Sequence, residues 1–522
     1  MLDFDMKEQL RSVFSKLEHV VVLRYAQATH PAQSELEEML RDLASTSEKL
    51  KVVQSDEASD APKFELFVSD MPTGISFRGV PGGHEFSSLV LSILYADGKG
   101  KRPDDGIVKR IQALRGPIRL KTYISLSCEN CPEVVQALNL MASLHSDFHH
   151  EMVDGAVAEG EVAELGIQGV PSVVSNGTLI VSGKISLIDL IAKFEAAFGK
   201  GEVSQNELNL GTFDVVVIGG GPAGASAAIY SARKGLRTAM IAERFGGQLQ
   251  ETKGIENMIS VSYTEGVQLA AQLSDHVAAY DIATFEHRRV AKIVPGVMKR
   301  IELESGEFVD ARVIIVATGA QWRKLGVPGE KENIGQGVAF CAHCDGPFYK
   351  GKRVAVVGGG NSGVEAAIDL SSIASQVTLL EMGDRLKADD VLIAKLKSIS
   401  NAAILTNAKS TRVLDDGRKV IGLEYQVRDS DRPQVLNLDG VFVQIGLLPN
   451  SQFVRGLIEV TPSGEIVVDS KGRTSIPGIY AAGDVTTIPF KQIVTAMGDG
   501  AKVALAAFED QMRASAVVYT AE

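Results

Sequence analysis

Short apolar runs, glycine-rich turns and helix-length segments follow one another twice in the second half of the chain. The first copy is FDVVVIGGGPAGASAAIYSARKGLRTAMIAE (213–243), and the second is KRVAVVGGGNSGVEAAIDLSSIASQVTLLE (352–381). A short apolar run that ends at glycines predicts a buried strand, and the longer segment after the turn predicts a helix. Each copy therefore predicts a strand–turn–helix–strand unit of a parallel sheet.

The first half of the chain predicts smaller units that also begin with a strand and a helix. A strand at 118–126 precedes a segment whose apolar side chains Val134, Leu138 and Met141 recur on one face of a helix. Further on, Asn176-Gly177 between two apolar runs predicts a β-hairpin. These elements together predict a small α/β domain.

An earlier stretch echoes this pattern. A strand at 20–25 precedes a helical stripe formed by Leu36, Leu40 and Leu43. The runs APKFELFV and GISFRG that follow predict a hairpin preceded by a proline. This part of the chain contains no cysteine, so we expect a copy that cannot exchange disulfides.

Composition narrows the class of protein. The 522 residues predict several domains, since single cores stop growing near ~250–300 residues. The net charge of −12 argues against a nucleic-acid partner, which requires a basic face. No apolar run approaches the ~18–20 residues of a membrane span, and the start, MLDFDMKEQL, lacks the features of a signal peptide. We therefore expect a cytoplasmic protein without a membrane or nucleic-acid partner.

All four cysteines fall into two CxxC pairs, Cys128/Cys131 and Cys341/Cys344. In the cytosol structural disulfides are rare, so such pairs indicate redox or metal chemistry. A shared zinc site is disfavoured because the usual gap between two pairs is ~15–20 residues, whereas these lie 210 positions apart. We predict two redox dithiols and no metal site.

The two strand–helix units carry dinucleotide-binding fingerprints. In GxGxxG the first glycine permits the tight turn, the second lets the backbone approach a pyrophosphate, and the third lets the helix pack on the strand. The helix N-terminus then offers amide donors to the phosphates. The fingerprint glycines are Gly219, Gly221 and Gly224 in the first copy and Gly358, Gly360 and Gly363 in the second.

A carboxylate ends the second strand of each copy, at Glu243 and Glu381. Such a group accepts a hydrogen bond from the ribose of the bound nucleotide. Two fingerprints imply two nucleotides, and the pairing suggests a flavin that takes hydride from a nicotinamide. Glu381 favours NADH, because it would repel the 2′-phosphate of NADPH, although Arg385 and Lys387 could reach such a phosphate.

The CxxC pair of the first half lies where a helix is expected to begin. That position favours the thiolate of Cys128, because unpaired amides at a helix N-terminus lower a thiol pKa. Cys131, one turn further, is placed to resolve a mixed disulfide, and Pro132 suits an early helix position. Glu85 could reach this dithiol as a base, although a glutamate in GGHEFSSLV is more often a solvated residue at a helix start.

Several segments resemble one flavoprotein family. VIIVATGAQWRKLGVPGE (313–330), GIYAAGDVTTIPFKQIVTAMGDGAKVA (478–504), FGGQ and IEN are similar to the thioredoxin-reductase branch of the two-dinucleotide-binding flavoproteins. The resemblance implies FAD bound by residues 211–327 and 449–522, with a nicotinamide domain (328–448) inserted between them. The FAD contacts that it implies are Gly219, Gly221, Ala223, Gly224, Glu243, Gln248, Asn257, Thr318, Gly319, Asp484 and Gln492.

The same resemblance assigns roles around CAHCDG. It implies that Cys344 faces the flavin, that Cys341 is the exchanging thiol, and that Asp345 manages the proton. An aspartate before Gly-Pro also suits a turn or a helix N-cap. Acid–base work and capping therefore remain as alternatives for Asp345.

The first half resembles the thioredoxin fold, on the evidence of a CxxC after a strand and of Pro171, where such folds keep a cis proline beside the dithiol. The predicted organisation is a cysteine-free thioredoxin-like fold (1–101), an active one (102–198) and a linker (199–210). Two Rossmann-like domains follow, with the NAD domain inserted in a discontinuous FAD domain. The fold class is thus α/β.

The whole arrangement resembles the F-subunit family of bacterial alkyl hydroperoxide reductases. That resemblance implies electron transfer from NADH to FAD, to Cys341/Cys344, to Cys128/Cys131 and to the disulfide of a peroxiredoxin, the C subunit. It implies a homodimeric NADH:disulfide oxidoreductase that supports hydroperoxide reduction. Two alternatives remain: a thioredoxin reductase fused to its own thioredoxin-like domain with broad disulfide substrates, and a non-catalytic redox sensor.

Overall fold

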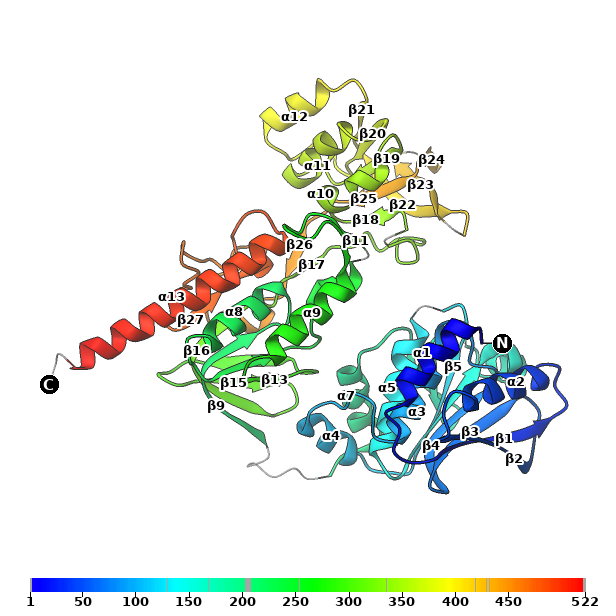
Figure 1. The fold of residues 1–522 in the computed structure, drawn as a ribbon. Helices are drawn as coiled ribbons and strands as arrows, with labels where there is room; N and C mark the ends of the chain where they lie inside the picture. The colour runs from blue at the N-terminus through cyan, green and yellow to red at the C-terminus, as the bar shows by residue number, and fades with distance from the viewer. Residues whose placement is uncertain are drawn as a thin grey trace. The chain divides into compact units, whose positions relative to one another are not determined.

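The computed structural model forms two compact units, Met1–Leu208 and Asn209–Glu522, and each is described by itself (Figure 1). The structure describes residues 2–128, 130–167, 169–201, 208–252, 254–334, 336–417, 419–428, 430 and 432–519. Most of the predicted linker, 202–207, therefore lies outside the described residues. Within the described ranges, no helix combines the length and the apolar character that a membrane span requires.

Unit 1 is built on one eight-stranded sheet in the order β2-β1-β3-β4-β6-β5-β7-β8. In each half a parallel pair is followed by two antiparallel pairings, and β4 and β6 join the halves in parallel. The strands are β1 (Val21–Ala28), β2 (Leu50–Ser59), β3 (Lys63–Val68), β4 (Met71–Arg78), β5 (Ile118–Ile124), β6 (Phe148–Asp154), β7 (Ser172–Ser175) and β8 (Thr178–Ser182). The sequence repeat is therefore a structural repeat, joined into one sheet.

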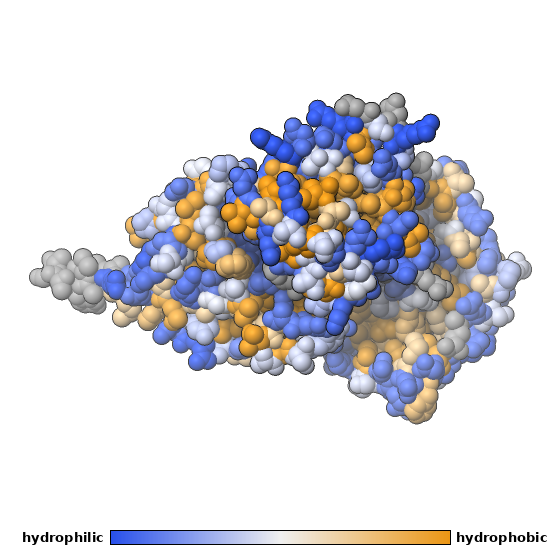
Figure 2. Space-filling view, turned by 90° about the horizontal axis from the view of Figure 1, so that it is seen from above, coloured by the Kyte–Doolittle hydropathy of each residue, from blue (hydrophilic) through white to orange (hydrophobic). Residues whose placement is uncertain are grey.

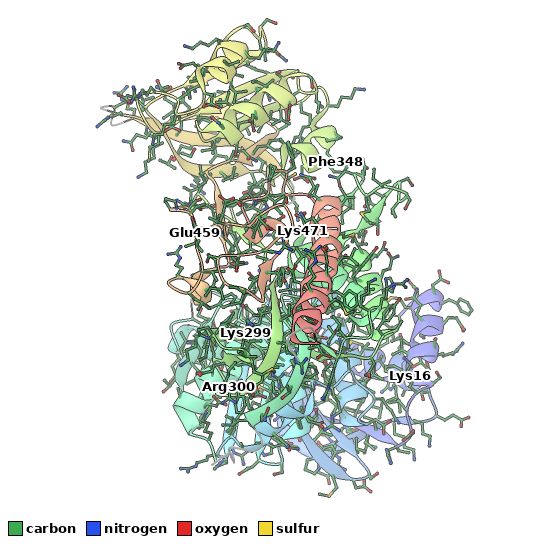
Figure 3. The ribbon with its side chains drawn as sticks, turned by 90° about the vertical axis from the view of Figure 1, so that its left-hand side faces the viewer. Lys16, Lys299, Arg300, Phe348, Glu459 and Lys471 are labelled. Carbon is green, nitrogen blue, oxygen red and sulfur yellow. The ribbon has the colours of Figure 1, made fainter. Side chains whose placement is uncertain are left out.

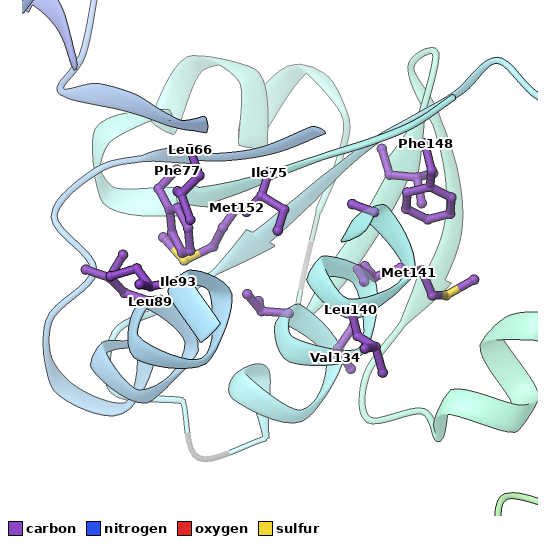
Figure 4. Close-up of a cluster of buried hydrophobic side chains, with 14 of the residues drawn as sticks. Leu66, Ile75, Phe77, Leu89, Ile93, Val134, Leu140, Met141, Phe148 and Met152 are labelled. Atoms are coloured by element: carbon purple, nitrogen blue, oxygen red, sulfur yellow. The ribbon is translucent and has the colours of Figure 1, made fainter. Parts of the chain in front are cut away.

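Apart from α6 (Glu159–Glu164), which has no buried residue, the helices of unit 1 bury apolar side chains in the core of the unit. They are α1 (Phe4–Phe14), α2 (Gln33–Ala44), α3 (Phe86–Ala96), α4 (Asp105–Gln112), α5 (Cys131–Leu144), α6 (Glu159–Glu164) and α7 (Leu187–Phe198), with the short turns η1 (Gly83–Glu85) and η2 (Gly155–Val157). One apolar cluster contains side chains from both repeats. Figure 4 shows Leu89 and Ile93 of α3 against Phe77 of β4, with Val134 and Leu140 on α5.

The predicted hairpin at Asn176-Gly177 is confirmed. These two residues join β7 to β8, and both have positive φ angles, 48° and 76°. A two-residue turn with positive φ at both positions matches the twist of the flanking strands, which is why Asn-Gly is favoured there. The local sequence therefore determines this turn.

Unit 2 contains two larger sheets that match the two fingerprint copies. The first has the order β13-β10-β9-β16-β15-β14, with β27 also paired to β16, and the second is the parallel sheet β18-β25-β19-β20-β21. The first sheet comprises β9 (Asn209–Ile218), β10 (Thr238–Ile241), β13 (Ile282–Phe285), β14 (Val290–Val294), β15 (Lys299–Leu303), β16 (Phe308–Val316) and β27 (Ile479–Ala481). The second comprises β18 (Val338–Ala339), β19 (Arg353–Val357), β20 (Gln376–Leu380), β21 (Ala402–Leu405) and β25 (Gly440–Val443).

The second sheet is an insertion into the first, as predicted. The chain leaves the first sheet through β17 (Ala320–Trp322), returns through β26 (Leu447–Pro449), and these two strands pair antiparallel. Afterwards β27 pairs in parallel with β16 of the first sheet. The exact domain boundaries given above remain predictions.

The remaining elements of unit 2 cover and connect these sheets. The helices are α8 (Pro222–Ala232), α9 (Gly266–Ala278), α10 (Ala342–Asp345), α11 (Asn361–Ser371), α12 (Asp390–Lys397) and α13 (Ile493–Tyr519). The short turns are η4 (Gly247–Glu251), η5 (Gly346–Tyr349), η6 (Gln452–Val454) and η7 (Gly483–Val485). The short strands are β11 (Gly254–Ile255), β12 (Thr264–Glu265), β22 (Ala408–Asp415), β23 (Val420–Val427) and β24 (Gln434–Asn437).

The surface over the inserted sheet is of mixed character. Figure 2 views unit 2 from the end that carries α12 and β21, and apolar residues there interrupt the hydrophilic surface. Met382, shortly after β20, and Val391 of α12 are 68% and 80% exposed. Scattered apolar residues of this kind are ordinary on protein surfaces, so they indicate no partner by themselves.

A buried ion pair ties two segments of the first sheet together. The guanidinium of Arg288, fully buried, donates to both carboxylate oxygens of Glu307 at 2.9 and 3.0 Å. Arg300 and Asp310 form the same bidentate arrangement, at 2.9 Å, but the Arg300 side chain is 46% exposed. The two pairs share one geometry and differ in burial.

We predict that Arg288→Leu lowers the free energy of unfolding of unit 2 by about 3–5 kcal/mol, because it leaves a buried carboxylate unpaired. The matched change Arg300→Leu is expected to cost no more than about 1 kcal/mol, because water screens an exposed pair. Denaturant unfolding followed by the fluorescence of Trp322, the one tryptophan of the sequence, measures both. Equal losses for the two variants would contradict the prediction.

Candidate functional site: two dinucleotide cradles and two dithiols

The first fingerprint forms an open cradle between β9 and α8. Gly219 has φ of +120°, and a side chain there would overlap the carbonyl of Ala317. A side chain at Gly224 would overlap the carbonyl of Gly219, whereas the space beside Gly221 is open. This pattern is the one that a bound pyrophosphate requires, with the α8 N-terminus facing it. The residues therefore fit the FAD that the sequence predicts.

The second fingerprint repeats this geometry between β19 and α11. Gly358 has φ of +127°, and a side chain there would overlap the carbonyl of Gln444. Gly363 lies against the carbonyl of Gly358, and the space beside Gly360 is again open. The three fingerprint glycines have equivalent surroundings in the two cradles, so the second fits a nicotinamide dinucleotide as well as the first fits FAD.

The acids that end the second strands are held differently in the two cradles. The carboxylate of Glu381 accepts hydrogen bonds from the amides of Gly359 and Gly383, at 2.8 and 2.7 Å. Glu243 instead forms an ion pair with Arg289, at 2.9 Å, and is 55% exposed. Arg289 was not among the residues that the sequence indicated, because it lies 46 positions after Glu243 in no motif.

Three of the residues expected beside the isoalloxazine lie at contacts within the first domain. The side-chain amide of Asn257 donates to Gln492 at 3.0 Å, so segments 235 positions apart meet there. The amide of Gln248 donates to the carbonyl of Ala320, at the start of β17. The Gln248 contact is made with the strand through which the chain enters the inserted domain.

Thr318 and Gly319 are bonded to Asn450, which the sequence analysis missed. The hydroxyl of Thr318 donates to the carbonyl of Asn450 at 2.7 Å, and the Asn450 amide donates back to the Thr318 carbonyl at 2.9 Å. The backbone N–H of Asn450 donates to Gly319 at 3.0 Å. These bonds join the two strands that cross between the domains. No local pattern in LLPNS distinguishes this asparagine from a turn residue.

Asp484 and Ala223 lie on the same side of the first cradle. Ala223 packs against Gly483 and Gly500, where a side chain on either glycine would collide with it. Asp484, which follows Gly483 in the chain, is half-buried. Burial raises the pKa of its carboxyl, and the charge of Lys491 opposes this rise. No hydrogen bond to the Asp484 carboxylate occurs among the described residues. It is available to a polar ligand in the cradle.

The dithiol of unit 2 is carried by α10 in the inserted domain. Cys341 immediately precedes α10 and is disulfide-bonded. The side chain of Cys344 lies outside the described residues, so its pairing with Cys341 remains a prediction. Asp345 ends α10, and burial raises the pKa of its carboxyl to about 6. Its side chain makes no capping bond to η5, so it does not cap that turn.

Phe348 of η5 marks where this dithiol segment meets the first domain. Figure 3 shows Phe348 beneath the inserted domain, and it is 47% exposed. A side chain placed at Gly254 on β11 would lie 3.5 Å from the Phe348 ring and 3.3 Å from Tyr263. The η5 turn therefore borders the β11–β12 hairpin of the first domain.

The dithiol of unit 1 has two chemically different thiols. Cys131 is fully buried, whereas Cys128 is partly exposed. Burial raises the pKa of Cys131 well above its usual range, and the neighbouring Cys128 and the charge of Glu85 add to this. The Cys128 sulfur lies 3.9 Å from the carbonyl of Val170, and the Val170–Pro171 bond is cis, as predicted.

Two sequence-based expectations about this dithiol need correction. The helix begins at Cys131, with Pro132 as its next residue, so Cys128 lies in the turn before the helix and not at its N-terminus. Glu85 is not solvated: it is 0% exposed at the end of η1. The residues around Glu85 in the sequence do not show that the other repeat buries its side chain.

Burial raises the pKa of Glu85 to about 7, with the Ser88 hydroxyl opposing the rise. Within the described part of the chain, neither Glu85 carboxylate oxygen makes a hydrogen bond of normal geometry. Its charge acts on Cys131. A carboxyl in a dry site beside a buried thiol can exchange a proton with it near neutral pH.

Comparison with known proteins identifies the same two parts. The pyridine nucleotide-disulphide oxidoreductase family matches residues 213–500, and the thioredoxin domain family matches residues 118–195. A thioredoxin reductase from Streptococcus pyogenes shares 34% identity with a TM-score of 0.55, and the match covers 57% of this chain and 97% of that structure. The likeness to that structure is therefore confined to little more than half of the chain.

Two relatives match nearly the whole chain. The F subunit of the alkyl hydroperoxide reductase of Pseudomonas putida is 46% identical over 99% of this chain and 100% of its own length. "NADH dehydrogenase" of Bacillus subtilis is 43% identical over 98% of this chain and 100% of its own length. The chain belongs to the F-subunit family of alkyl hydroperoxide reductases, and it is an NADH-dependent flavoprotein disulfide oxidoreductase.

Proposed function

We propose that this chain relays electrons from its nicotinamide cradle through two dithiols to the disulfide of a peroxiredoxin, and so supports hydroperoxide reduction. The observation that carries the proposal is that one chain combines two equivalent open cradles with two CxxC pairs. When bound, FAD and NADH supply the electron pair that reduces the disulfide at Cys341. The remaining steps are thiol–disulfide exchanges made by this chain's own residues.

Each exchange breaks one S–S bond and forms another. The thiolate of Cys341 attacks the disulfide of Cys128/Cys131, and the mixed disulfide is resolved by Cys344, which leaves the unit 1 dithiol reduced. Asp345 takes up or returns the proton of the unit 2 dithiol. A carboxyl whose pKa is raised to about 6 by burial supports this role, because it changes charge close to neutral pH.

The exposure of the unit 1 thiols supports an order of events. Cys128, partly exposed, attacks the peroxiredoxin disulfide and forms a mixed disulfide. Cys131, buried one turn away, attacks the sulfur of Cys128 and expels the peroxiredoxin thiolate. Because burial raises the pKa of Cys131, its proton must be removed, and Glu85 is the base beside it.

In this proposal each cradle binds one nucleotide: FAD in the first domain and the nicotinamide dinucleotide in the inserted domain. We assign the FAD contacts named in the sequence analysis to the first cradle, and Gly358, Gly360, Gly363 and Glu381 to the nicotinamide dinucleotide in the second. The carboxylate of Glu381 is anchored by two amides, and it would accept a hydrogen bond from the 2′-hydroxyl of the adenosine ribose. This arrangement supports the selection of NADH over NADPH.

We also propose a homodimer that acts in the cytoplasm. The homodimer is what the resemblance to the F-subunit family implies. Two CxxC pairs with redox chemistry suit the cytosol, because structural disulfides are rare there. Sedimentation velocity of the purified protein tests the dimer, and a monomeric mass would overturn it.

Changing Cys128 and Cys131 together to serine is expected to stop peroxiredoxin-dependent NADH oxidation, because the last exchange step loses its nucleophile. The measurement is NADH oxidation with a peroxiredoxin and a hydroperoxide. The control is anaerobic absorbance, which should show that both proteins still reduce their flavin and the disulfide at Cys341. If the variant turns over as fast as the wild type, electrons leave directly from Cys341.

Glu85→Gln is expected to slow the resolving step roughly 100-fold, the scale of one positioned base. The chain is first changed at Cys341 and Cys344 to serine, reduced, and mixed with 5,5′-dithiobis(2-nitrobenzoate). The first thiolate released reports attack by Cys128, and the second reports attack by Cys131. Only the second phase should slow.

The pH dependence of that second phase follows from the raised pKa of Glu85. The carboxylate form predominates above about pH 7, so the wild-type rate should rise through that pH and the Gln variant should lose this inflection. Glu133→Gln is the control. Glu133 lies on α5, the helix that begins at Cys131, but it is 44% exposed and paired with Lys184. If the rate of the second phase is unchanged in Glu85→Gln, Glu85 is not the base.

Glu381→Ala is expected to lower kcat/KM for NADH by about 10- to 100-fold, because a hydrogen bond to a charged acceptor contributes about 1.5–3 kcal/mol. The value for NADPH should rise, since a like charge near its phosphate is removed. Glu365→Ala, an exposed carboxylate on α11, is the control. The prediction fails if both coenzymes lose efficiency equally.

A further inference from the structure

A chain of buried polar side chains crosses the apolar core of unit 1 between its two repeats. We call it the polar seam; it consists of Glu85, Ser88, Ser92, Thr122, Gln136, Asn139 and His150. All of these residues except Gln136 are at most 1% exposed. Polar groups are costly in such a core unless they are hydrogen-bonded, so the seam calls for an explanation.

The seam pairs α3 with α5 in matching order. At one end the η1 turn, which Glu85 ends, packs against α5, which begins at Cys131, and the charge of Glu85 raises the pKa of that thiol. In the middle the Gln136 amide donates to the Ser88 hydroxyl at 3.3 Å. Further along, the Asn139 amide donates to the Ser92 hydroxyl at 2.9 Å. In these pairs the residue number rises along α3 as it rises along α5. The two helices therefore run in the same direction, with their polar stripes facing each other.

The far end of the seam is anchored to the central sheet. The Asn139 side-chain oxygen lies 2.5 Å from Nδ1 of His150 on β6. The other ring nitrogen, Nε2, lies 2.8 Å from the hydroxyl of Thr122 on the adjacent strand β5. Burial lowers the pKa of His150 to about 3, so the ring is neutral and can donate at Nδ1 and accept at Nε2.

Directional bonds set a register that apolar packing does not. Around the seam, α3 and α5 pack through Leu89, Ile93 and Val134 (Figure 4), and such contacts have no preferred direction. A slip of one helical turn moves a side chain about 5.4 Å along the axis. It would also leave buried amide and hydroxyl groups without partners. A single buried asparagine is a known way to fix helix register.

We propose that Asn139 is a positioning residue: through Ser92 and His150 it fixes the register of α3 on α5, and so holds Glu85 over Cys131. The inference rests on the proposed proton-accepting role of Glu85. It also gives the cysteine-free repeat a task, since that repeat supplies α3 and Glu85. Among the described residues, the titratable groups that act on one another at this end are Glu85, Cys128 and Cys131.

The test uses the two-phase thiol reaction described for Glu85→Gln, in the same full chain with serines at Cys341 and Cys344. Asn139→Leu keeps the size of the side chain and removes its hydrogen bonds. We expect its second phase to slow about as much as in Glu85→Gln and to lose the inflection near pH 7. The first phase, which reports Cys128, should keep its rate.

A second pair of variants guards against misfolding of the leucine variant. Ser92→Ala removes the hydroxyl that receives the Asn139 amide, and Ser92→Thr keeps a hydroxyl there. We expect Ser92→Ala to slow the second phase and Ser92→Thr to restore it. Leu140→Ala, next to Asn139 on α5 but outside the seam, removes buried apolar volume and should leave the pH inflection in place.

The outcomes separate the two proposals. If Glu85→Gln itself leaves the second phase unchanged, the proposed base is wrong and the seam has no catalytic task. If Glu85→Gln slows the phase but Asn139→Leu and Ser92→Ala do not, the positioning role is overturned while the base stands. If Leu140→Ala abolishes the inflection as the seam variants do, general loosening of the core explains the effect, and the inference is again overturned.

Discussion

The close approach of a helix to the carbonyl end of a strand is the contact on which the relay depends. At Gly224 and Gly363 the helix backbone lies against the strand so closely that no side chain fits between them. This approach brings the helix N-terminus over the open space beside Gly221 and Gly360, where phosphates bind. Both nucleotides, and hence the electrons that reach the dithiols, depend on the absence of two side chains.

In unit 1 the same problem of placing reactive groups is solved by duplication. Two halves with the same strand pairing share one sheet, and a single apolar core extends across both. One half supplies the thiols and the other supplies Glu85. Burial then makes the groups unequal: Cys128 stays accessible, while the pKa values of Cys131 and Glu85 rise. The chemistry of the dithiol therefore arises from the environment and not from the spacing of its cysteines.

The proton-accepting roles proposed for Glu85 and Asp345 rest on one physical principle. Each has a carboxyl whose pKa is raised by burial, to about 7 at Glu85 and to about 6 at Asp345. A raised pKa lets a carboxyl exchange protons near neutral pH, where an exposed one is always ionised. The raised pKa of Glu85 also affects the free energy of unfolding. Its contribution is least favourable above pH 7, where the charged carboxylate is buried with no hydrogen-bond partner among the described residues.

Local patterns in the sequence determined the strand–turn–helix units, the Asn176-Gly177 hairpin and the residues of both cradles, because glycine spacing and apolar periodicity act within a few residues. The two CxxC pairs are likewise visible in the sequence, whereas the cis Val170–Pro171 bond was expected from the resemblance to the thioredoxin fold, and the structure confirms it. Tertiary structure alone decided the burial of Glu85, the ion pair of Arg289 with Glu243, and the bonds of Asn450 and Asn139. Each of these joins residues that are distant in the chain, so pKa values and partners emerge only when packing has excluded water.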